Sequence, residues 1–138
     1  MQPLSSPTVS KGARWGGLVM SVLPALFLLL DGGMKLVKPA PVVEATVQLG
    51  YSETVIVPIG IILLSCTILY LIPATSVLGA ILLTGYLGGS VATHVRAGSG
   101  AFPITFPIIF GVLLWGGLYL RDTRLRALIP LRKLTVRS

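Results

Sequence analysis

Four ionisable residues stand where strongly apolar runs of this sequence end. Asp31 and Lys35 follow one run in LFLLLDGGMKLVK, and His94 and Arg96 end another in ATHVRAG. On a helix, Asp31 and Lys35 share one face with the acid first, which is the favourable order for an ion pair. Ionisable side chains within a membrane segment indicate a functional site, because their burial is costly. Together the four could line a small polar cavity for a proton or a polar head group.

A structural role for the same residues is the alternative. Asp31 would then neutralise a nearby lysine or arginine, and the basic side chains would extend toward the membrane surface. His94 would simply hydrogen-bond to a neighbour. In either case a buried carboxylate needs a partner, so we expect Asp31 to approach His94 or Arg96. One histidine and scattered carboxylates are too few to predict a metal site.

The rest of the sequence offers no catalytic set. Cys66 is the single cysteine, so neither an intramolecular disulfide nor a CxxC redox pair can form. The sequence has no phosphate-binding glycine loop, no GxSxG turn and no HExxH helix. Catalysis by this chain alone is therefore not expected, and no cofactor is expected from these residues.

The composition indicates a membrane protein. The chain has 138 residues, of which 54% are apolar and only 11% are charged, and its mean hydropathy is +0.91. Soluble proteins carry about 25% charged residues, so a chain this poor in charge cannot cover a surface that faces water. The net charge is +7, but no nucleic-acid-binding motif accompanies it. The expected partner is the lipid bilayer, and nucleic acid is not.

The charges divide the apolar sequence into four candidate spans. Between Glu53 and Arg96 lie 42 residues without Asp, Glu, Lys or Arg. That is too long for one span, since a helix needs about 20 residues to cross a bilayer. Pro73 divides the segment, because a proline disfavours helix in the residue before it. The predicted spans are 15–37, 54–72, 76–95 and 102–120. The sequence therefore predicts an all-α membrane protein, a four-transmembrane-helix bundle.

A short helix is predicted between the first two spans. The first span is expected to continue past the Asp31–Lys35 pair to about Val37, because Leu36 and Val37 restore its apolar character. The apolar residues of the following VVEATVQLG have approximate helical spacing, and Gly50 ends this stretch where a helix often ends. We interpret it as an amphipathic helix on the membrane surface. An ordinary loop is the alternative.

Basic residues predict the orientation of the chain. Two precede the first span and six follow the fourth, whereas the opposite side of the membrane holds three. The positive-inside rule then places both termini in the cytoplasm of a plasma-membrane protein. The chain divides into a disordered tail at 1–14, a membrane domain at 15–120 and a basic tail at 121–138.

The third span carries a face of small residues. The face consists of Ala80, Thr84, Gly85, Gly88, Gly89 and Ala92, and it includes a GxxxG pair. Small residues let helix backbones approach closely within a bilayer. We expect this face to be the tightest packing seam inside the bundle. A seam with a second copy or with a partner protein is the alternative.

Longer stretches resemble a known family. DGGMKLVKPAPVVEATVQLGY and LLTGYLGGSVATHVRAG resemble the DoxX-like family of small membrane proteins, and the similarity covers roughly residues 15–130. The resemblance implies a four-helix membrane bundle. The family is named for a small subunit associated with a quinone-reducing sulfur oxidoreductase. It therefore implies quinone as a candidate ligand and a membrane oxidoreductase as a candidate partner. The architecture is loosely similar to that of vitamin K epoxide reductase, but the cysteines for such chemistry are missing.

Three functions are consistent with these features. The first is a non-catalytic accessory or scaffold subunit of a membrane complex, because no catalytic set exists and the small-residue face could bind a partner. The second is a quinone- or small-ligand-binding subunit of a membrane oxidoreductase system, with the four ionisable residues at the polar end of its pocket. Proton-coupled transport of a small solute ranks last, because no inverted repeat is present.

Overall fold

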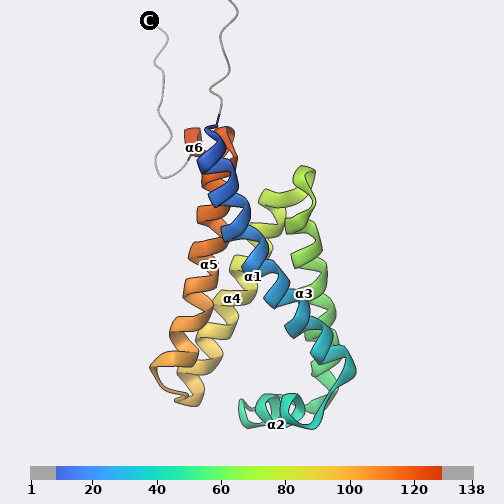
Figure 1. The fold of residues 1–138 in the computed structure, drawn as a ribbon. Helices are drawn as coiled ribbons and strands as arrows, with labels where there is room; N and C mark the ends of the chain where they lie inside the picture. Colours follow the sequence, from blue (N-terminus) through green and yellow to red (C-terminus); the bar gives the residue numbers. More distant parts are fainter. Residues whose placement is uncertain (1–8, 129–138) are drawn as a thin grey trace, which may run out of the picture.

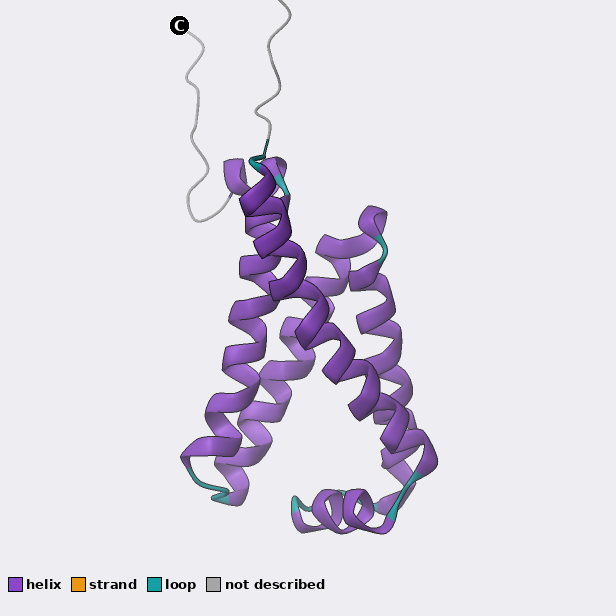
Figure 2. Cartoon of the chain, viewed as in Figure 1, coloured by secondary structure: helices purple, strands orange, loops and turns teal. Residues whose placement is uncertain are grey.

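Residues 9–128 are described by the structure, a computed structural model, and they are almost entirely helical (Figure 2). The elements are α1 (Lys11–Val37), α2 (Ala40–Gln48), η1 (Glu53–Val55), α3 (Ile56–Leu71), η2 (Pro73–Thr75), α4 (Ser76–Ala97), α5 (Ala101–Arg121) and α6 (Thr123–Leu128). Four helical segments are apolar and long enough to cross a membrane: α1, η1 with α3, η2 with α4, and α5. The predicted all-α bundle of four spans is confirmed, and so is a short helix between the first two.

Helix α1 crosses the bundle from one neighbour to another. Figure 1 shows its first half beside α5 and its second half beside α3. The α4–α5 hairpin and the α1–α3 pair therefore diverge toward one end, where α2 lies across the bundle. We call this the α2 end, and we call the opposite end, where α1 begins and α5 stops, the terminal end.

Glycines fix both close contacts of α1. A Cβ atom added to Gly117 would lie 2.8 Å from the carbonyl oxygen of Gly17, so α1 and α5 almost touch near the terminal end. A Cβ atom on Gly60 would lie 3.0 Å from the carbonyl oxygen of Gly32, so α1 and α3 approach equally closely further along. Small residues permit such backbone approaches in membrane bundles. The two contacts explain why α1 follows α5 first and α3 later.

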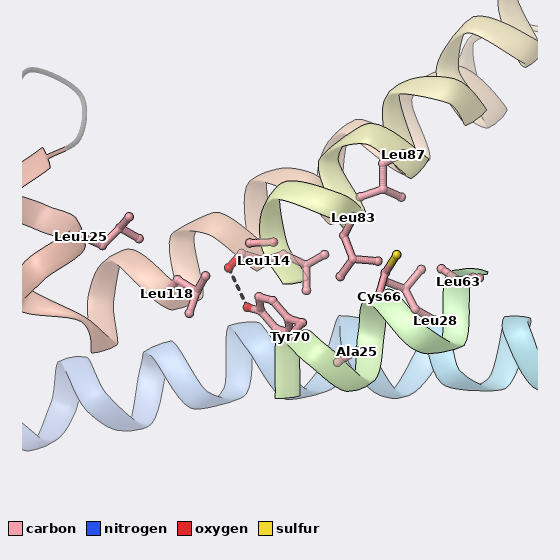
Figure 3. Packing of buried hydrophobic residues seen from close by; sticks show 11 residues of the cluster. Ala25, Leu28, Leu63, Cys66, Tyr70, Leu83, Leu87, Leu114, Leu118 and Leu125 are labelled. Atoms are coloured by element: carbon pink, nitrogen blue, oxygen red, sulfur yellow. Dashed lines mark hydrogen bonds between the residues drawn. The ribbon is translucent and has the colours of Figure 1, made fainter. Parts of the chain in front are cut away.

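The core lies between these contacts and toward the terminal end. Tyr70 of α3 is buried, and its hydroxyl donates to the carbonyl oxygen of Leu114 in α5 at 2.7 Å (Figure 3). The same hydroxyl lies 2.8 Å from the Ser21 hydroxyl of α1. Three helices thus share one buried polar contact, which satisfies groups that would be costly to leave unpaired away from water. Cys66 is buried in this apolar cluster, as expected for a small core residue.

The outer surface of the bundle is apolar. Leu30 on α1 and Val112 on α5 are each 65% exposed, and similar exposed side chains occur on α3 and α4. Exposed apolar area of this extent is unusual for a protein in water and marks a lipid or protein contact surface. It is the surface expected of spans that face lipid.

The helices extend slightly beyond the ends predicted for the membrane domain. Helix α1 begins at Lys11 rather than Trp15, because the Ser10 hydroxyl accepts a hydrogen bond from the Ala13 amide at 3.2 Å and so caps the helix. The predicted N-terminal tail is therefore wrong for 11–14, and its residues 1–8 lie outside the described part. The predicted C-terminal tail contains Arg121, which ends α5, and the helix α6, and its residues 129–138 also lie outside the described part.

Candidate functional site

A cavity of about 690 Å³ lies between the two helix pairs toward the α2 end. Its wall comes from α1, α2, α4 and α5, while α3 contributes only Ile59. Pockets for small organic ligands have volumes of roughly 300–1,000 Å³. The cavity therefore has the size of a ligand site, and it exists because α1 leaves α5 to join α3.

Phenylalanines form the apolar part of the wall. Phe27 of α1 packs against Phe106 and Phe110 of α5, with ring centroids 5.4 and 5.0 Å apart. Phe102 continues the row one helical turn before Phe106. Edge-on and tilted aromatic pairs of this spacing are favourable. The rings join α1 to α5 beyond their glycine contact, and they give the cavity a continuous aromatic side.

Asp31 and Lys35 form the charged part of the wall. Lys35 Nζ donates to Asp31 Oδ2 at 2.6 Å across one turn of α1. The Lys35 side chain is only 15% exposed and that of Asp31 is 38% exposed. The predicted ion pair is confirmed. It lies inside the last turns of a span rather than in a loop, since α1 continues to Val37.

Hydrogen-bonding side chains of α4 face the same space. Tyr86, Ser90, Thr93 and His94 all line the cavity. His94 Nδ1 lies 3.1 Å from the Ser99 hydroxyl in the α4–α5 connection, which fixes the orientation of the imidazole. The described residues give His94 Nε2 no hydrogen-bond partner, so this nitrogen remains able to bind a ligand.

The segment that contains α2 closes the cavity at its end. The Tyr51 hydroxyl lies 2.8 Å from the Thr93 hydroxyl, and Arg96 Nη2 donates to the Leu49 carbonyl oxygen at 3.1 Å. These two contacts, which we call the rim contacts, join the α2 segment to α4. No residue of α2 itself is buried. The cover is thus held mainly by its chain connections and by the rim contacts.

The sequence matches a known protein family over most of its length. A model of the DoxX-like family matches residues 19–117. The chain belongs to the DoxX-like family. The match runs from within α1 to within α5, so it includes most of the bundle and the whole cavity wall. Together with its four candidate spans, it makes the chain a small integral membrane protein. Comparisons with curated proteins and with solved structures gave no match.

This DoxX-like chain brings three of the four predicted ligand residues to one cavity. Asp31, Lys35 and His94 line it, whereas Arg96 lies at the rim and binds a backbone carbonyl. The expected contact of Asp31 with His94 or Arg96 does not occur among the described residues. The prediction is wrong because the helix pairs have separated at this depth. Lys35 satisfies Asp31 within one helix instead.

The small-residue face does not form the predicted internal seam. Ala80 is buried, but Cβ atoms on Gly85, Gly88 and Gly89 would meet nothing within 4 Å. Thr84 and Ala92 are exposed as well, although Thr84 accepts a hydrogen bond from Trp115 Nε1 at 2.7 Å. The glycines of this face point to two different places. Gly85 and Gly89 line the cavity, and Gly88 faces a shallow groove between α4 and α5.

Sequence reasoning missed the aromatic wall. Phe102, Phe106 and Phe110 recur every four positions, which places them on one face of α5. That spacing was a usable signal for a continuous aromatic surface. The role of Tyr51 could not be found in this way, because it depends on a contact with Thr93 across the bundle.

Proposed function

We propose that this DoxX-like protein binds a small amphiphilic ligand in the cavity between its helix pairs and acts as a non-catalytic subunit of a membrane redox system. One observation carries the proposal. A single cavity of about 690 Å³ joins a row of phenylalanines to the Asp31–Lys35 pair and His94. Ligand sites commonly combine a mostly apolar wall with a few converging polar groups.

Quinone is a ligand that fits this chemistry. Its apolar body matches the aromatic wall, and its carbonyl oxygens could accept hydrogen bonds from hydroxyl or imidazole groups of α4. The chain itself would bind and orient the ligand. Electrons would come from a partner protein, because Cys66 is the only thiol in the sequence. This division of labour is that of an accessory subunit.

The orientation inferred from the basic residues supports an outward-facing α2 end. Both termini would lie in the cytoplasm of a plasma-membrane protein, since the termini side holds eight of the eleven Lys and Arg residues. In a Cys66→Ser background, Ser99→Cys should react with an impermeant maleimide added to intact cells. Thr123→Cys should react only after lysis. The reverse pattern would refute the orientation.

Two glycine substitutions test ligand binding. Gly89→Leu should fill part of the cavity without displacing another helix, because nothing lies within 4 Å of a Cβ there. Gly88→Leu is the matched control, one residue away and outside the cavity wall. We expect a short-chain ubiquinone to raise the thermal midpoint of the wild type and of Gly88→Leu, but not that of Gly89→Leu. Equal shifts in all three proteins would refute the site.

A scaffold without a ligand is the second candidate, and the exposed small-residue face supports it. Gly88 and Ala92 are available to a second copy or a partner helix. In this case Gly88→Leu should weaken self-association or partner capture in mild detergent, whereas Gly89→Leu in the cavity should not. If the protein binds a ligand, Gly89→Leu should be the variant that loses function, and if it is a scaffold, Gly88→Leu should be.

A further inference from the structure

The charges that line the cavity are neutralised inside the protein. Lys35 Nζ contacts Asp31 Oδ2 at 2.6 Å, and both side chains are partly buried. Of the other wall residues within the described range 9–128, only His94, Tyr51 and Tyr86 can ionise. The cavity thus offers one compact ion pair and several neutral hydrogen-bonding groups, with no formal charge left over when His94 is neutral.

The neighbouring charges are also engaged. Lys38 and Glu53 pair at 3.2 Å at the base of the α2 segment. Arg96 Nη2 donates to the Leu49 carbonyl oxygen at the rim and does not line the cavity. Glu44 lies exposed on α2. A ligand inside the cavity therefore meets the Asp31–Lys35 pair before any other charge.

This arrangement penalises charged head groups. An anionic head group that accepts a hydrogen bond from Lys35 would lie beside the Asp31 carboxylate, and a cationic one that donates to Asp31 would lie beside the Lys35 ammonium. Either arrangement brings two like charges together in a partly buried place, which is unfavourable. An uncharged head group meets no such repulsion. It can accept a hydrogen bond from a remaining hydrogen of the Lys35 ammonium or donate one to a remaining lone pair of the Asp31 carboxylate.

We propose that the Asp31–Lys35 pair determines the charge specificity of the cavity, so that it selects amphiphiles with an uncharged hydrogen-bonding head group over acids and amines of the same chain length. The inference rests on the proposed ligand site. It adds to it the class of ligand that the site accepts and the two residues that set this class.

Charge variants and three matched amphiphiles test the proposal. The probes are dodecanol, dodecanoate and dodecylamine, and the proteins are reconstituted in phosphatidylcholine nanodiscs at pH 8. The variants are Asp31→Asn, Lys35→Gln, and the reversed pair Asp31→Lys with Lys35→Asp. Apparent dissociation constants come from displacement of a fluorescent fatty alcohol. Each probe partitions equally into all nanodiscs, so ratios between variants cancel the partitioning.

We expect dodecanol to bind the wild type most tightly after correction for partitioning into empty nanodiscs. Asp31→Asn frees Lys35 and should improve dodecanoate relative to dodecanol by about tenfold, the scale of one charge-assisted hydrogen bond. Lys35→Gln should improve dodecylamine by a similar factor. The reversed pair restores neutrality and should restore the wild-type order. If the pair has only a structural role, the single variants should have a lower thermal midpoint than the wild type but the same order of affinities for the three amphiphiles.

Several results would overturn the inference. The inference is wrong if dodecanoate or dodecylamine binds the wild type more tightly than dodecanol does. It is also wrong if a folded single variant keeps the wild-type order of affinities for the three amphiphiles. The wild-type order tests the idea without any substitution. If no amphiphile binds the wild type, the ligand site itself fails together with its specificity. If amphiphiles bind and Gly89→Leu abolishes this binding while the order never changes, only the charge specificity is wrong.

Discussion

At the residue scale, glycines set the distances between helices, and their effect depends on what faces them. Gly117 lies against the Gly17 carbonyl and the Ser21 side chain, whereas nothing lies within 4 Å of a Cβ on Gly88. Both glycines are in helix interiors, so intrinsic helix propensity would favour alanine at either place. The packing around each glycine therefore decides whether an alanine there stabilises or destabilises the bundle.

Gly117→Ala should therefore destabilise the bundle. The added methyl group must push α1 away from α5, and overpacking of this kind typically costs about 1–3 kcal/mol. Gly88→Ala meets no neighbour and should be neutral or stabilising by up to about 1 kcal/mol. Thermal unfolding in one detergent, followed by circular dichroism, compares the two. A Gly117→Ala midpoint equal to that of the wild type would show that α1 and α5 do not pack this closely.

Spacing alone predicted the contact within one helix but not the contact between helices. Asp31 and Lys35 are neighbours on any α-helix, so their pairing followed from the sequence. The expected contact with His94 required two helices to remain close at the depth of their ends. That distance depends on Gly32 and Gly60, which draw α1 toward α3 instead. No pattern in the sequence distinguished these partners.

At the element scale, the α2 segment is the least firmly held part of the cavity. No residue of α2 is buried, and the side-chain hydrogen bonds between the described α2 segment and α4 are the two rim contacts. Apolar runs, prolines and Gly50 located this helix in the sequence. They could not show that it covers a cavity, because the cavity arises from how the long helices cross.

Removing one rim contact should make the α2 segment open more often. Tyr51→Phe removes the hydroxyl that meets Thr93, and Arg96→Leu removes the donor to the Leu49 carbonyl. A hydrogen bond contributes a net 0.5–1.5 kcal/mol, so amide exchange in residues 40–51 should accelerate by roughly two- to tenfold. Hydrogen–deuterium exchange by mass spectrometry measures this.

Tyr119→Phe provides the control for that experiment. Tyr119 lies exposed on α5 far along the chain from α2, and its loss of a hydroxyl should leave exchange in residues 40–51 unchanged. Wild-type exchange in both rim variants would mean that the chain connections alone hold the cover in place.

At the scale of the whole molecule, the number and order of the spans followed from the sequence, and family membership agrees with them. The small-residue face of α4 showed where space would lie, but not what would fill it. Gly89 leaves room for a cavity and Gly88 leaves room outside the bundle. Sequence patterns indicate that a helix face consists of small residues. Only the crossing of α1 determines whether a helix, a ligand or a lipid lies against it.

The divergence of the helix pairs has a consequence for the surrounding bilayer. The bundle widens from the terminal end to the α2 end (Figure 1), so the protein has the outline of a wedge. A wedge displaces more lipid area from one leaflet than from the other, and the membrane relaxes this asymmetry by bending. We expect the protein to concentrate in vesicles whose curvature matches its taper. Its density in reconstituted vesicles of small and large diameter, counted by fluorescence, would reveal such sorting, and equal densities would contradict it.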